Sequence, residues 1–368
     1  MSWKFESFGS LFEYENKSKI KAGDGMLKGN HPFFTSSTEQ NKYLDIYSYN
    51  KKSLIFGTGG NPSIHYCDIP FSVSTDCLVS FPKDTSLVYP KYVYYYISGN
   101  IHLLEKGFKG AGLKHISKTY INEIPIPLPP LHIQVEIANT LDKADALRRK
   151  DQELLNKYDE LAQAIFYDMF GDTLLNDKKW VGKNVSELIT FMTSGSRGWA
   201  TYYSETGELF LRINNVKNAT LFLDDVVYVN PPDTAESKRT LVKPRDVLLS
   251  ITADLGRTAV VPDTIKKAYI NQHLALLRLN NKINPYYLAH FMNSRGGQEQ
   301  IRKGNKGGVK AGLNFNDIKE LSILVPPTQL QNEFENAIKK LRVVIDVHKK
   351  NSSLPINLFN TLSIKYFS

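Results

Sequence analysis

The sequence predicts an α+β protein: two mixed α/β domains in a pseudo-two-fold arrangement, joined by two long antiparallel helices that form a coiled coil. Three observations lead to this prediction. The chain has 368 residues, a length that suits two domains. A Pro-Pro pair with a glutamine shortly after it occurs twice, at Pro129 and at Pro326. Each pair is followed by a long charged stretch whose apolar residues recur at heptad-like spacing.

The internal repeat relates the two halves of the chain. The first copy reads Pro129-Pro130 with Gln134 and the second reads Pro326-Pro327 with Gln331, so the offset is 197 residues. Two copies of one unit imply internal pseudo-symmetry, which suits a partner with its own two-fold symmetry, such as duplex DNA. Further pairs extend the repeat upstream: Ala111-Gly112-Leu113 with Ala311-Gly312-Leu313, Pro90 with Pro285, and Tyr92 with Tyr287.

The first domain is expected over residues 1–130. Tyr, Phe, Ile and Val alternate there with polar residues between Gly, Asn and Pro breaks, which predicts short strands such as Ser53–Phe56 and Asp76–Phe81. Tyr92–Leu104 has its aromatic and apolar residues on one side, which predicts a helix. The second domain is expected over residues 172–327, with its extra length in loops. An alternative is that the two copies diverged without any division between a shared scaffold and separate recognition surfaces.

Two long helices are predicted, over residues 131–171 and 328–368. The first contains no Gly or Pro for about 40 residues, which corresponds to a helix of roughly 60 Å, and Gly171 would end it. The second has Pro355 in its interior. Proline there removes a hydrogen bond and clashes with the preceding turn, so a break is expected near residues 351–355. The apolar stripes alone do not select antiparallel pairing, but a domain lying between the helices makes it the easier closure.

The composition favours a polyanionic partner. The net charge is +9 and the isoelectric point is near 9.2. No stretch of about 18 apolar residues suggests a membrane span, and the first residues lack the apolar core of a signal peptide. Cys67 and Cys77 could pair, but two cysteines do not indicate a secreted disulfide framework. The expected compartment is the reducing cytoplasm.

No catalytic, cofactor or metal site is predicted. Asn230-Pro231-Pro232 looks like the start of the Asn-Pro-Pro-aromatic motif of adenine methyltransferases, but Asp233 follows in place of a ring that could stack on a flipped base. The glycine-rich run Phe56–Gly60 is weak evidence for a cofactor loop without a βαβ unit and an acidic residue about 20 positions later. The eight histidines are scattered and lack the spacing of metal ligands.

Two basic, glycine-rich segments occupy the same place in the repeat. Their lysines and arginines suit contacts with DNA phosphates, through side-chain charge and exposed backbone N–H groups. The alternative is two solvated loops. The predicted phosphate-contacting residues are Lys106, Lys109 and Lys114 in the first copy, and Arg302, Lys303, Lys306 and Lys310 in the second.

Base-reading residues are sought among side chains in predicted loops, because Arg suits guanine and Asn or Gln suits adenine. For Arg212 the alternative is an ion pair with Asp224 or Asp225. The candidates are Lys28, Asn30, Ser36, Thr58 and Asn61 in the first copy, and Arg197, Arg212, Asn214, Asn215, Arg257 and Gln272 in the second.

In this organisation the sequence resembles the specificity subunit of type I restriction-modification systems, over the whole chain. The resemblance is carried by IPIPLPPLHIQVEIANTLDKADAL, its echo SILVPPTQLQNEFENAIKKL, the junction FGDTLLNDKKW, and the phrases GNHPFFTSS, LFLRINNV and YINQHLALLRL. It implies two target recognition domains, each followed by a spacer helix, in a subunit without catalytic activity or cofactors. It also implies that each domain reads one half of a bipartite, asymmetric site on double-stranded DNA.

The resemblance implies protein partners as well. Two methyltransferase subunits that modify adenine would dock on the helices, and translocating restriction subunits would complete the enzyme. Pro355 departs from the continuous second helix of the family. Two alternatives stay open. One is a coiled-coil scaffold whose globular domains bind protein, and the other is a specificity subunit that works with a fused nuclease-methyltransferase.

Overall fold

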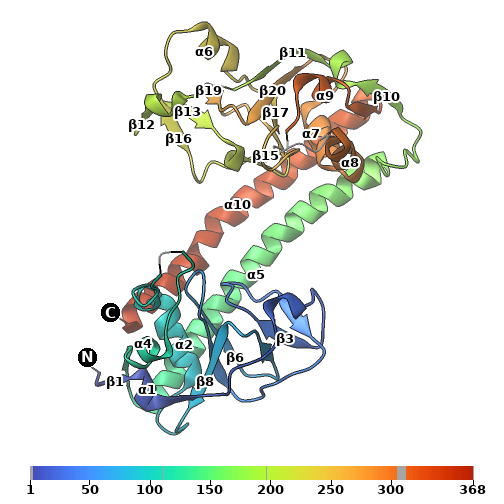
Figure 1. Ribbon diagram of the computed structural model, residues 1–368. Coiled ribbons are helices and arrows are strands. Elements are labelled where there is room, and N and C mark those ends of the chain that lie inside the picture. The colour runs from blue at the N-terminus through green and yellow to red at the C-terminus, as the bar shows by residue number, and fades with distance from the viewer. Residues whose placement is uncertain (1–2, 111, 196, 305–311, 368) are drawn as a thin grey trace. The chain divides into compact units, whose positions relative to one another are not determined.

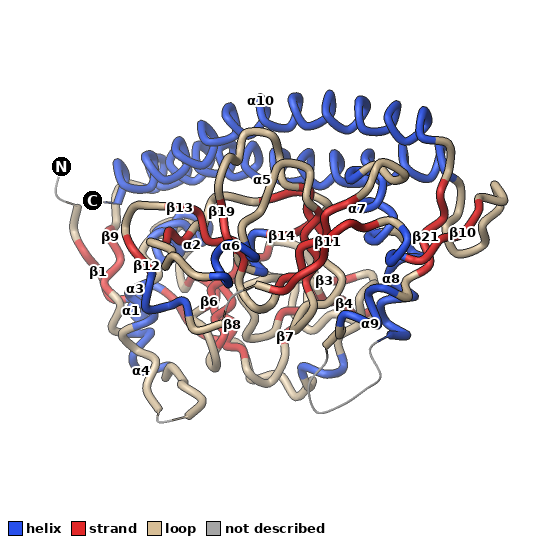
Figure 2. The backbone as a smooth tube through the Cα atoms, turned by 90° about the horizontal axis from the view of Figure 1, so that it is seen from above, coloured by secondary structure: helices blue, strands red, loops and turns tan. Residues whose placement is uncertain are grey.

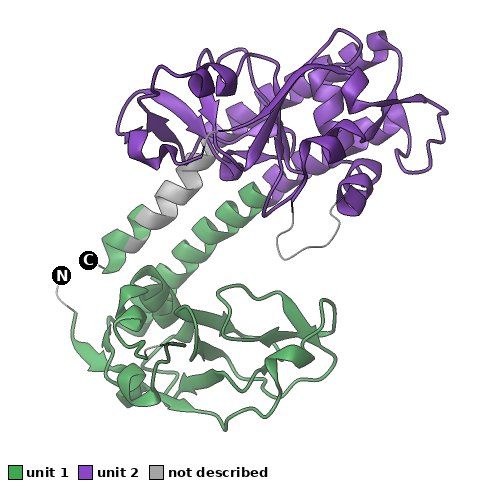
Figure 3. Cartoon of the chain, turned by 45° about the horizontal axis from the view of Figure 1, so that its top comes forward, with its two compact units in different colours: residues 1–152, 351–368 green, residues 153–350 purple. Residues whose placement is uncertain are grey.

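The computed structural model describes residues 3–110, 112–195, 197–304 and 312–367, with the backbone alone at 351–360 and 363 (Figure 1). The chain divides into two compact units (Figure 3). Unit 1 comprises Met1–Gln152 and Asn351–Ser368, and unit 2 comprises Glu153–Lys350. Each unit is a mixed α/β domain that also contains part of each long helix, which confirms the predicted fold class.

Unit 1 contains two sheets and a short strand pair. Strands β2, β8, β5 and β6 form an antiparallel sheet in that order, and β3 lies between antiparallel β4 and parallel β7. Strand β1 pairs with β9. The elements are β1 (Phe5–Ser7), α1 (Phe8–Leu11), β2 (Phe12–Tyr14), η1 (Ala22–Asp24), β3 (His31–Phe34), β4 (Lys42–Leu44), β5 (Ser53–Gly57), β6 (Ser63–Cys67), β7 (Ser72–Val73), β8 (Cys77–Pro82), α2 (Pro90–Gly99), α3 (His102–Glu105), α4 (Lys118–Asn122) and β9 (Pro125–Pro127).

Unit 2 repeats these sheets. Strands β11, β20, β17 and β18 form the antiparallel sheet, β13 lies between antiparallel β16 and parallel β19, and β10 pairs with β21. The elements are β10 (Val181–Asn184), η2 (Val185–Glu187), β11 (Ile189–Ser194), η3 (Trp199–Tyr202), β12 (Tyr203–Ser204), β13 (Glu208–Leu211), η4 (Ile213–Asn215), β14 (Val216–Lys217), β15 (Thr220–Leu221), β16 (Val227–Val229), α6 (Ala235–Thr240), β17 (Val247–Ser250), β18 (Thr258–Val260), β19 (Ala268–Ile270), β20 (Leu274–Leu279), α7 (Pro285–Asn293), α8 (Arg295–Gly304), α9 (Phe315–Lys319) and β21 (Ser322–Val325).

The extra length of the second copy is not only loop. Unit 2 carries the β14–β15 pair, the strand β12 and the helix α6 in addition to the elements that match unit 1. The hairpin and α6 both lie between β13 and β19, on the same stretch of chain that connects β3 to β7 in unit 1. The addition therefore sits beside the shared sheets and leaves their strand order unchanged.

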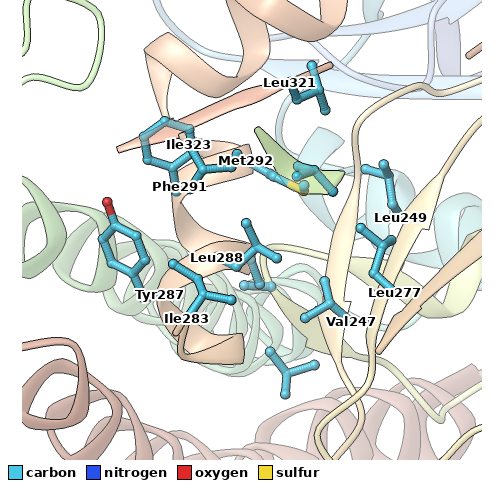
Figure 4. Packing of buried hydrophobic residues seen from close by; sticks show 14 of the residues in the cluster. Val247, Leu249, Leu277, Ile283, Tyr287, Leu288, Phe291, Met292, Leu321 and Ile323 are labelled. Atoms are coloured by element: carbon cyan, nitrogen blue, oxygen red, sulfur yellow. The ribbon is translucent and has the colours of Figure 1, made fainter. Parts of the chain in front are cut away.

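The core of unit 2 forms where α7 packs on the antiparallel sheet. Figure 4 shows Val247, Leu249 and Leu277 of the sheet facing Leu288 and Met292 of α7. All five side chains are at most 1% exposed. Burial of apolar side chains is the main favourable contribution to folding, so this layer fixes the sheet whose strand ends carry the candidate site.

The two long helices are α5 (Leu131–Phe170) and α10 (Thr328–Phe367). Within unit 2 they pack antiparallel, as two ring contacts establish. The rings of Phe166 and Phe334 lie 5.6 Å apart, and those of Tyr158 and His348 lie 5.7 Å apart. From the first contact to the second, the residue number decreases on α5 and increases on α10, so the two helices run in opposite directions. In unit 1, Ile137 and Leu141 of α5 are buried in the core against which the last turns of α10 pack.

Helix α10 corrects the prediction of a break near residues 351–355. It runs without interruption from Thr328 to Phe367 (Figure 2). Proline in a helix interior costs about 3 kcal/mol relative to alanine. Both ends of α10 are anchored by burial, with Phe334 and Ile338 in the core of unit 2 and Phe367 against Tyr92 and Tyr96 in unit 1. Burying several large side chains outweighs a single proline.

The Pro-Pro motif marks a buried glutamine clamp in each unit. Gln134 accepts a hydrogen bond from the backbone N–H of Tyr89 (2.8 Å) and donates to the carbonyls of Leu87 (2.9 Å) and Pro129 (2.8 Å). Gln331 accepts from the N–H of Asn284 (2.7 Å) and donates to the carbonyl of Pro326 (2.7 Å). Both glutamines are fully buried. The repeated sequence pattern therefore ties the start of α5 to the start of α2, and the start of α10 to the start of α7.

One sequence pairing upstream is wrong by three residues. Leu313 is 5% exposed and its N–H donates to the carbonyl of Ile251 (3.0 Å). In unit 1 the equivalent residue is Ile116, also 5% exposed, whose N–H donates to the carbonyl of Thr58 (3.1 Å). Leu113, which the sequence pairs with Leu313, is 78% exposed. The offset of 197 residues thus holds upstream as far as Ile116, and the two Ala-Gly-Leu runs match by coincidence.

The cysteines do not pair. Cys67 and Cys77 are both free and buried. They lie opposite the two ends of β5, Cys67 across from Ser53 and Cys77 across from Gly57. A search of the described helices finds no segment with the length and hydropathy of a membrane span.

Acid sensitivity is expected from one carboxylate of unit 2. Glu335 of α10 accepts hydrogen bonds from Arg245 (2.6 and 2.9 Å), Asn284 (2.5 Å) and Lys339 (2.7 Å). Burial by itself would raise the pKa of Glu335, but these donors hold the pKa at about 2, below the ordinary value of 4.5. The ionised Glu335 therefore contributes its full stabilisation of the folded state above its ordinary pKa, and this contribution is lost as the pH falls from about 5 towards 2.

The prediction is that Glu335→Gln destabilises unit 2 at pH 7, and that the difference from wild type shrinks between pH 5 and pH 2. Urea unfolding at several pH values measures it. Glu333→Gln, at an exposed position on the same helix, is the control. A difference that stays constant with pH would contradict this assignment.

Candidate nucleic-acid interface

In unit 1 the ends of three strands meet at one edge. Ser36 follows β3, Thr58 follows β5, and Asp76 precedes β8. The hydroxyls of Ser36 and Thr58 both donate to the backbone carbonyl of Asp76, at 2.7 and 2.9 Å. Two of the predicted base-reading residues are therefore adjacent in space although they are far apart in sequence. Asn61 is exposed in the turn that follows Thr58.

The basic loop of unit 1 docks on this edge. The carbonyl of Lys114 accepts from the N–H of Gly60 (3.2 Å), and Lys109 and His115 exchange two backbone hydrogen bonds (2.9 and 3.0 Å). Gly60 has φ +80°, a conformation that glycine adopts without strain. The side chains of Lys106, Lys109 and Lys114 are exposed. The structure thus brings the loop that carries Lys109 and Lys114 next to the turn that carries Thr58 and Asn61.

Two candidates of unit 1 lie elsewhere. Lys28 and Asn30 precede β3, whereas Ser36 follows it, so they lie at the opposite end of that strand. Both are exposed, and the N–H of Asn30 donates to the carboxylate of Asp45 (3.2 Å). The structure does not bring them together with the edge formed by Ser36 and Thr58.

The corresponding edge of unit 2 carries a polar network. Arg197 donates from Nε to Oε1 of Gln272 (3.0 Å), and Nε2 of Gln272 lies 3.2 Å from Nε2 of His273. Nδ1 of His273 lies 2.5 Å from the hydroxyl of Thr252, which follows β17. Two predicted base-reading residues, Arg197 and Gln272, are thus in contact. Thr252 also pairs with Gly312 in a β-bridge, so the chain that leaves the second basic segment reaches this edge as it does in unit 1.

Two other candidates of unit 2 are paired with acidic neighbours, and a third is exposed. Arg257 pairs with Asp254 within the β17–β18 turn. Arg212 pairs with Asp225 (2.9 Å), the alternative anticipated from the sequence. Asn214 is exposed.

The structure corrects the prediction that Asn215 reads a base. It is 2% exposed, and its amide donates to the carbonyls of Phe222 (2.8 Å) and Asp225 (2.9 Å). Its Oδ1 accepts from the N–H of Arg212 (2.8 Å). With its hydrogen-bonding groups committed to the backbone, Asn215 shapes the loop and is not available to read a base.

The basic segment of the second copy is described in part. Arg302 and Lys303 are exposed at the end of α8, and both pair with Glu299, at 2.7 and 3.6 Å. Exposed pairs of this kind contribute little to stability. Lys306 and Lys310 lie outside the described residues.

The sequence did not single out Arg239 and His273, although the structure places both side chains near the strand edge of unit 2. Arg239 of α6 donates to the carbonyl of Ser194 (2.8 Å) and to the hydroxyl of Thr193, which places a guanidinium near the end of β11. Nothing in the sequence indicates this, because α6 has no counterpart in the first copy. For His273, its position next to the candidate Gln272 in the sequence could have indicated a place near this edge.

The two motifs that suggest enzymes occupy structural positions. Phe56–Gly60 ends β5 and enters the antiparallel β5–β6 turn, so no helix follows it as a dinucleotide site requires. Pro232 precedes α6 and its carbonyl accepts the hydroxyl of Ser237. Across the described ranges, no group of three or more His, Cys, Asp or Glu side chains is placed to hold a metal ion.

A duplicated α/β scaffold, whose equivalent strand edge is bridged by His115 in unit 1 and by Gly312 in unit 2, defines the class of two-domain recognition subunits. The family description "Type I restriction modification DNA specificity domain" matches this chain twice, over residues 1–157 and 157–353. The chain belongs to this family, and it is a specificity subunit of a type I restriction-modification system with two target recognition domains.

Individual relatives are distant in sequence but similar along most of the chain. The MjaVIII specificity subunit of Methanocaldococcus jannaschii is 19% identical, over 95% of this chain and 88% of that protein. The EcoBI specificity subunit of Escherichia coli is 21% identical, over 92% and 76%. The crystal structure of the type I S subunit from M. genitalium superposes with a TM-score of 0.62 at 17% identity, covering 100% of this chain and 96% of that one. This structure supports the fold alone.

Proposed function

We propose that the chain is a non-catalytic reader of a bipartite, asymmetric site on double-stranded DNA, each unit recognising one half in the pseudo-two-fold arrangement that the repeat predicts. The observation that carries the proposal is the pair of equivalent strand edges. Both edges belong to the shared scaffold and receive a basic chain segment. Unit 1 carries Ser36 and Thr58 at this edge, after β3 and β5, whereas unit 2 carries Arg197 and Gln272 there, after β11 and before β20. A shared edge that carries different polar side chains in each unit suits two half-sites of different sequence.

The partners belong to the same proposal. Two adenine-N6 methyltransferase subunits dock on α5 and α10, restriction and translocase subunits join to form the nuclease, and the complex acts on DNA in the cytoplasm. No catalytic step is assigned to this chain. The phosphate contacts proposed for the second copy include Arg302, Lys303, Lys306 and Lys310, and the remaining base-reading candidates are Lys28, Asn30, Asn61, Arg212, Asn214 and Arg257.

The deciding experiment purifies the chain with its methyltransferase subunits and maps N6-methyladenine after incubation with genomic DNA and methyl donor. The expected result is methylation at one split sequence. Methylation without sequence preference would overturn the proposal. A protein-binding scaffold would instead show little affinity for random duplex DNA and no steep loss of binding with salt. The identity of the co-purifying subunits separates this system from one with a fused nuclease-methyltransferase.

The lysines of the unit-1 loop give a quantitative prediction. Lys109→Gln with Lys114→Gln is expected to weaken binding to all sequences alike, and to lower the slope of log affinity against log salt by about two. Each lysine contributes a charge and reads no base. The matched control is Lys52→Gln with Lys83→Gln, which removes two exposed lysines at the opposite end of the same sheet. Fluorescence anisotropy across a salt series measures the slope, and equal slopes for the two double variants would refute the contacts.

A further inference from the structure

We propose that Leu113 is an apolar wedge that inserts into a base step of the DNA half-site read by unit 1 and opens that step. The inference rests on the proposed function and specifies how the loop acts on its DNA. The side chain of Leu113 is 78% exposed. Single exposed apolar residues are common on protein surfaces. The assignment therefore depends on where this leucine is held and on what surrounds it.

The backbone that carries Leu113 has a set position. Lys109 and His115 close the base of the loop with two backbone hydrogen bonds, at 2.9 and 3.0 Å. Gly110, with φ +144°, lets the chain return so closely that a Cβ at this position would lie 2.8 Å from the carbonyl oxygen of Leu113. The loop tip is thus braced from below, while the leucine side chain remains exposed to solvent.

Leu113 has no role in the core of unit 1. In unit 2 the residue that seals this junction is Leu313, and in unit 1 the same position is filled by Ile116, each 5% exposed. The unit-1 chain reaches Ile116 through Gly112, Leu113 and Lys114, all exposed. An exposed leucine in this segment is therefore not explained by packing of the fold.

The surroundings of Leu113 match those of a DNA wedge. Lys109 and Lys114 are exposed on the same loop, and the carbonyl of Lys114 is hydrogen-bonded to Gly60 in the turn after Thr58. Lysine contacts with phosphates would press the duplex against the loop, where an apolar side chain gains by leaving water. Proteins that deform DNA insert Leu, Ile, Met or Phe between base pairs in this way, and the added contacts offset the unstacking.

The test uses the chain assembled with its methyltransferase subunits, without methyl donor. The probe is a duplex that carries the mapped site, with 2-aminopurine replacing one adenine at a time in the unit-1 half. The wild type is expected to raise the fluorescence at a step other than the methylated adenine. Leu113→Ala is expected to abolish that signal and to weaken site binding about ten-fold, the effect of losing one buried leucine side chain. The salt slope should not change, because no phosphate contact is lost.

Two further variants make the result decisive. Leu113→Met keeps an apolar side chain and is expected to keep the signal. Leu87→Ala shortens another exposed leucine of unit 1 (54% exposed), in the segment that follows β8 at the other end of the sheet, and should behave as wild type. Two results would overturn the wedge and leave the proposed function intact, provided that the wild type binds its site. One is that Leu113→Ala gives the same affinity and fluorescence as Leu87→Ala, and the other is that the wild type raises the fluorescence at none of the probed steps. Absence of site-specific binding by the wild type would overturn the proposed function and the wedge together.

Discussion

Gln331→Ala is expected to destabilise unit 2 by roughly 2–6 kcal/mol. The side chain is fully buried and its amide joins the N–H of Asn284 to the carbonyl of Pro326, both at 2.7 Å. Alanine leaves both backbone groups without these partners, and an unsatisfied buried polar group costs about 1–3 kcal/mol. The effect is large because Asn284 also caps α7 and donates to Glu335 (2.5 Å), so the loss reaches both helices.

Guanidinium unfolding followed by tryptophan fluorescence measures this effect, because Trp180 and Trp199 lie in unit 2. The control is Gln329→Ala, an exposed glutamine two residues earlier that bonds only to Glu333 among described residues, and it should stay within about 0.5 kcal/mol of wild type. A similar midpoint for both variants would show that the clamp does not stabilise the junction.

The clamp also shows what the sequence could predict. The recurrence of Pro-Pro with a glutamine five residues later, together with the heptad spacing, was sufficient for two α/β domains and two long helices. The function of Gln134 and Gln331 was not predictable, because their partners lie some 45 residues upstream on segments that come near only after folding. Local pattern reports periodicity, whereas long-range hydrogen bonds depend on tertiary structure.

The dependence on tertiary structure also explains two wrong predictions: the pairing of Leu113 with Leu313, and the break in the second long helix. The shared Ala-Gly-Leu sequence paired Leu113 with Leu313. Burial shows instead that Ile116 is equivalent to Leu313, since both are buried and Leu113 is exposed. Pro355 predicted a break from local sterics, but packing at both ends of α10 preserves the helix. Local propensity is a weak prior that tertiary packing overrides.

Candidate base readers were chosen by residue type, and their location depended on strand order. Ser36 and Thr58 come together because β3 and β5 end at the edge where β8 begins. Lys28 and Asn30 are separated from them by the length of β3, a consequence of chain direction that composition cannot report. Asn215 has the right side chain for adenine, but it is buried and fully hydrogen-bonded. The structure thus narrows the candidates by geometry.

Gln272→Ala is expected to remove discrimination at one base pair of the unit-2 half-site, by about 1–3 kcal/mol, which corresponds to roughly 5- to 150-fold. A glutamine amide can bond bidentately to adenine, and Gln272 is held beside the end of β17 by Arg197 (3.0 Å) and His273 (3.2 Å). Preference at the other positions, and throughout the unit-1 half-site, should not change. Methylation rates on a library of single-base variants of the site measure the change.

The controls separate reading from positioning. Asn281→Ala removes an exposed amide just beyond the other end of β20 and should leave the whole preference unchanged. Because Arg197 donates to Gln272, the two residues should couple, and the double alanine variant should lose less than the sum of the single losses. If Gln272 only orients Arg197, then Arg197→Ala will relax the same base pair at least as strongly, and Gln272→Ala will add nothing to it. If Gln272 reads the base itself, its removal relaxes an adenine position that Arg197→Ala leaves partly specified.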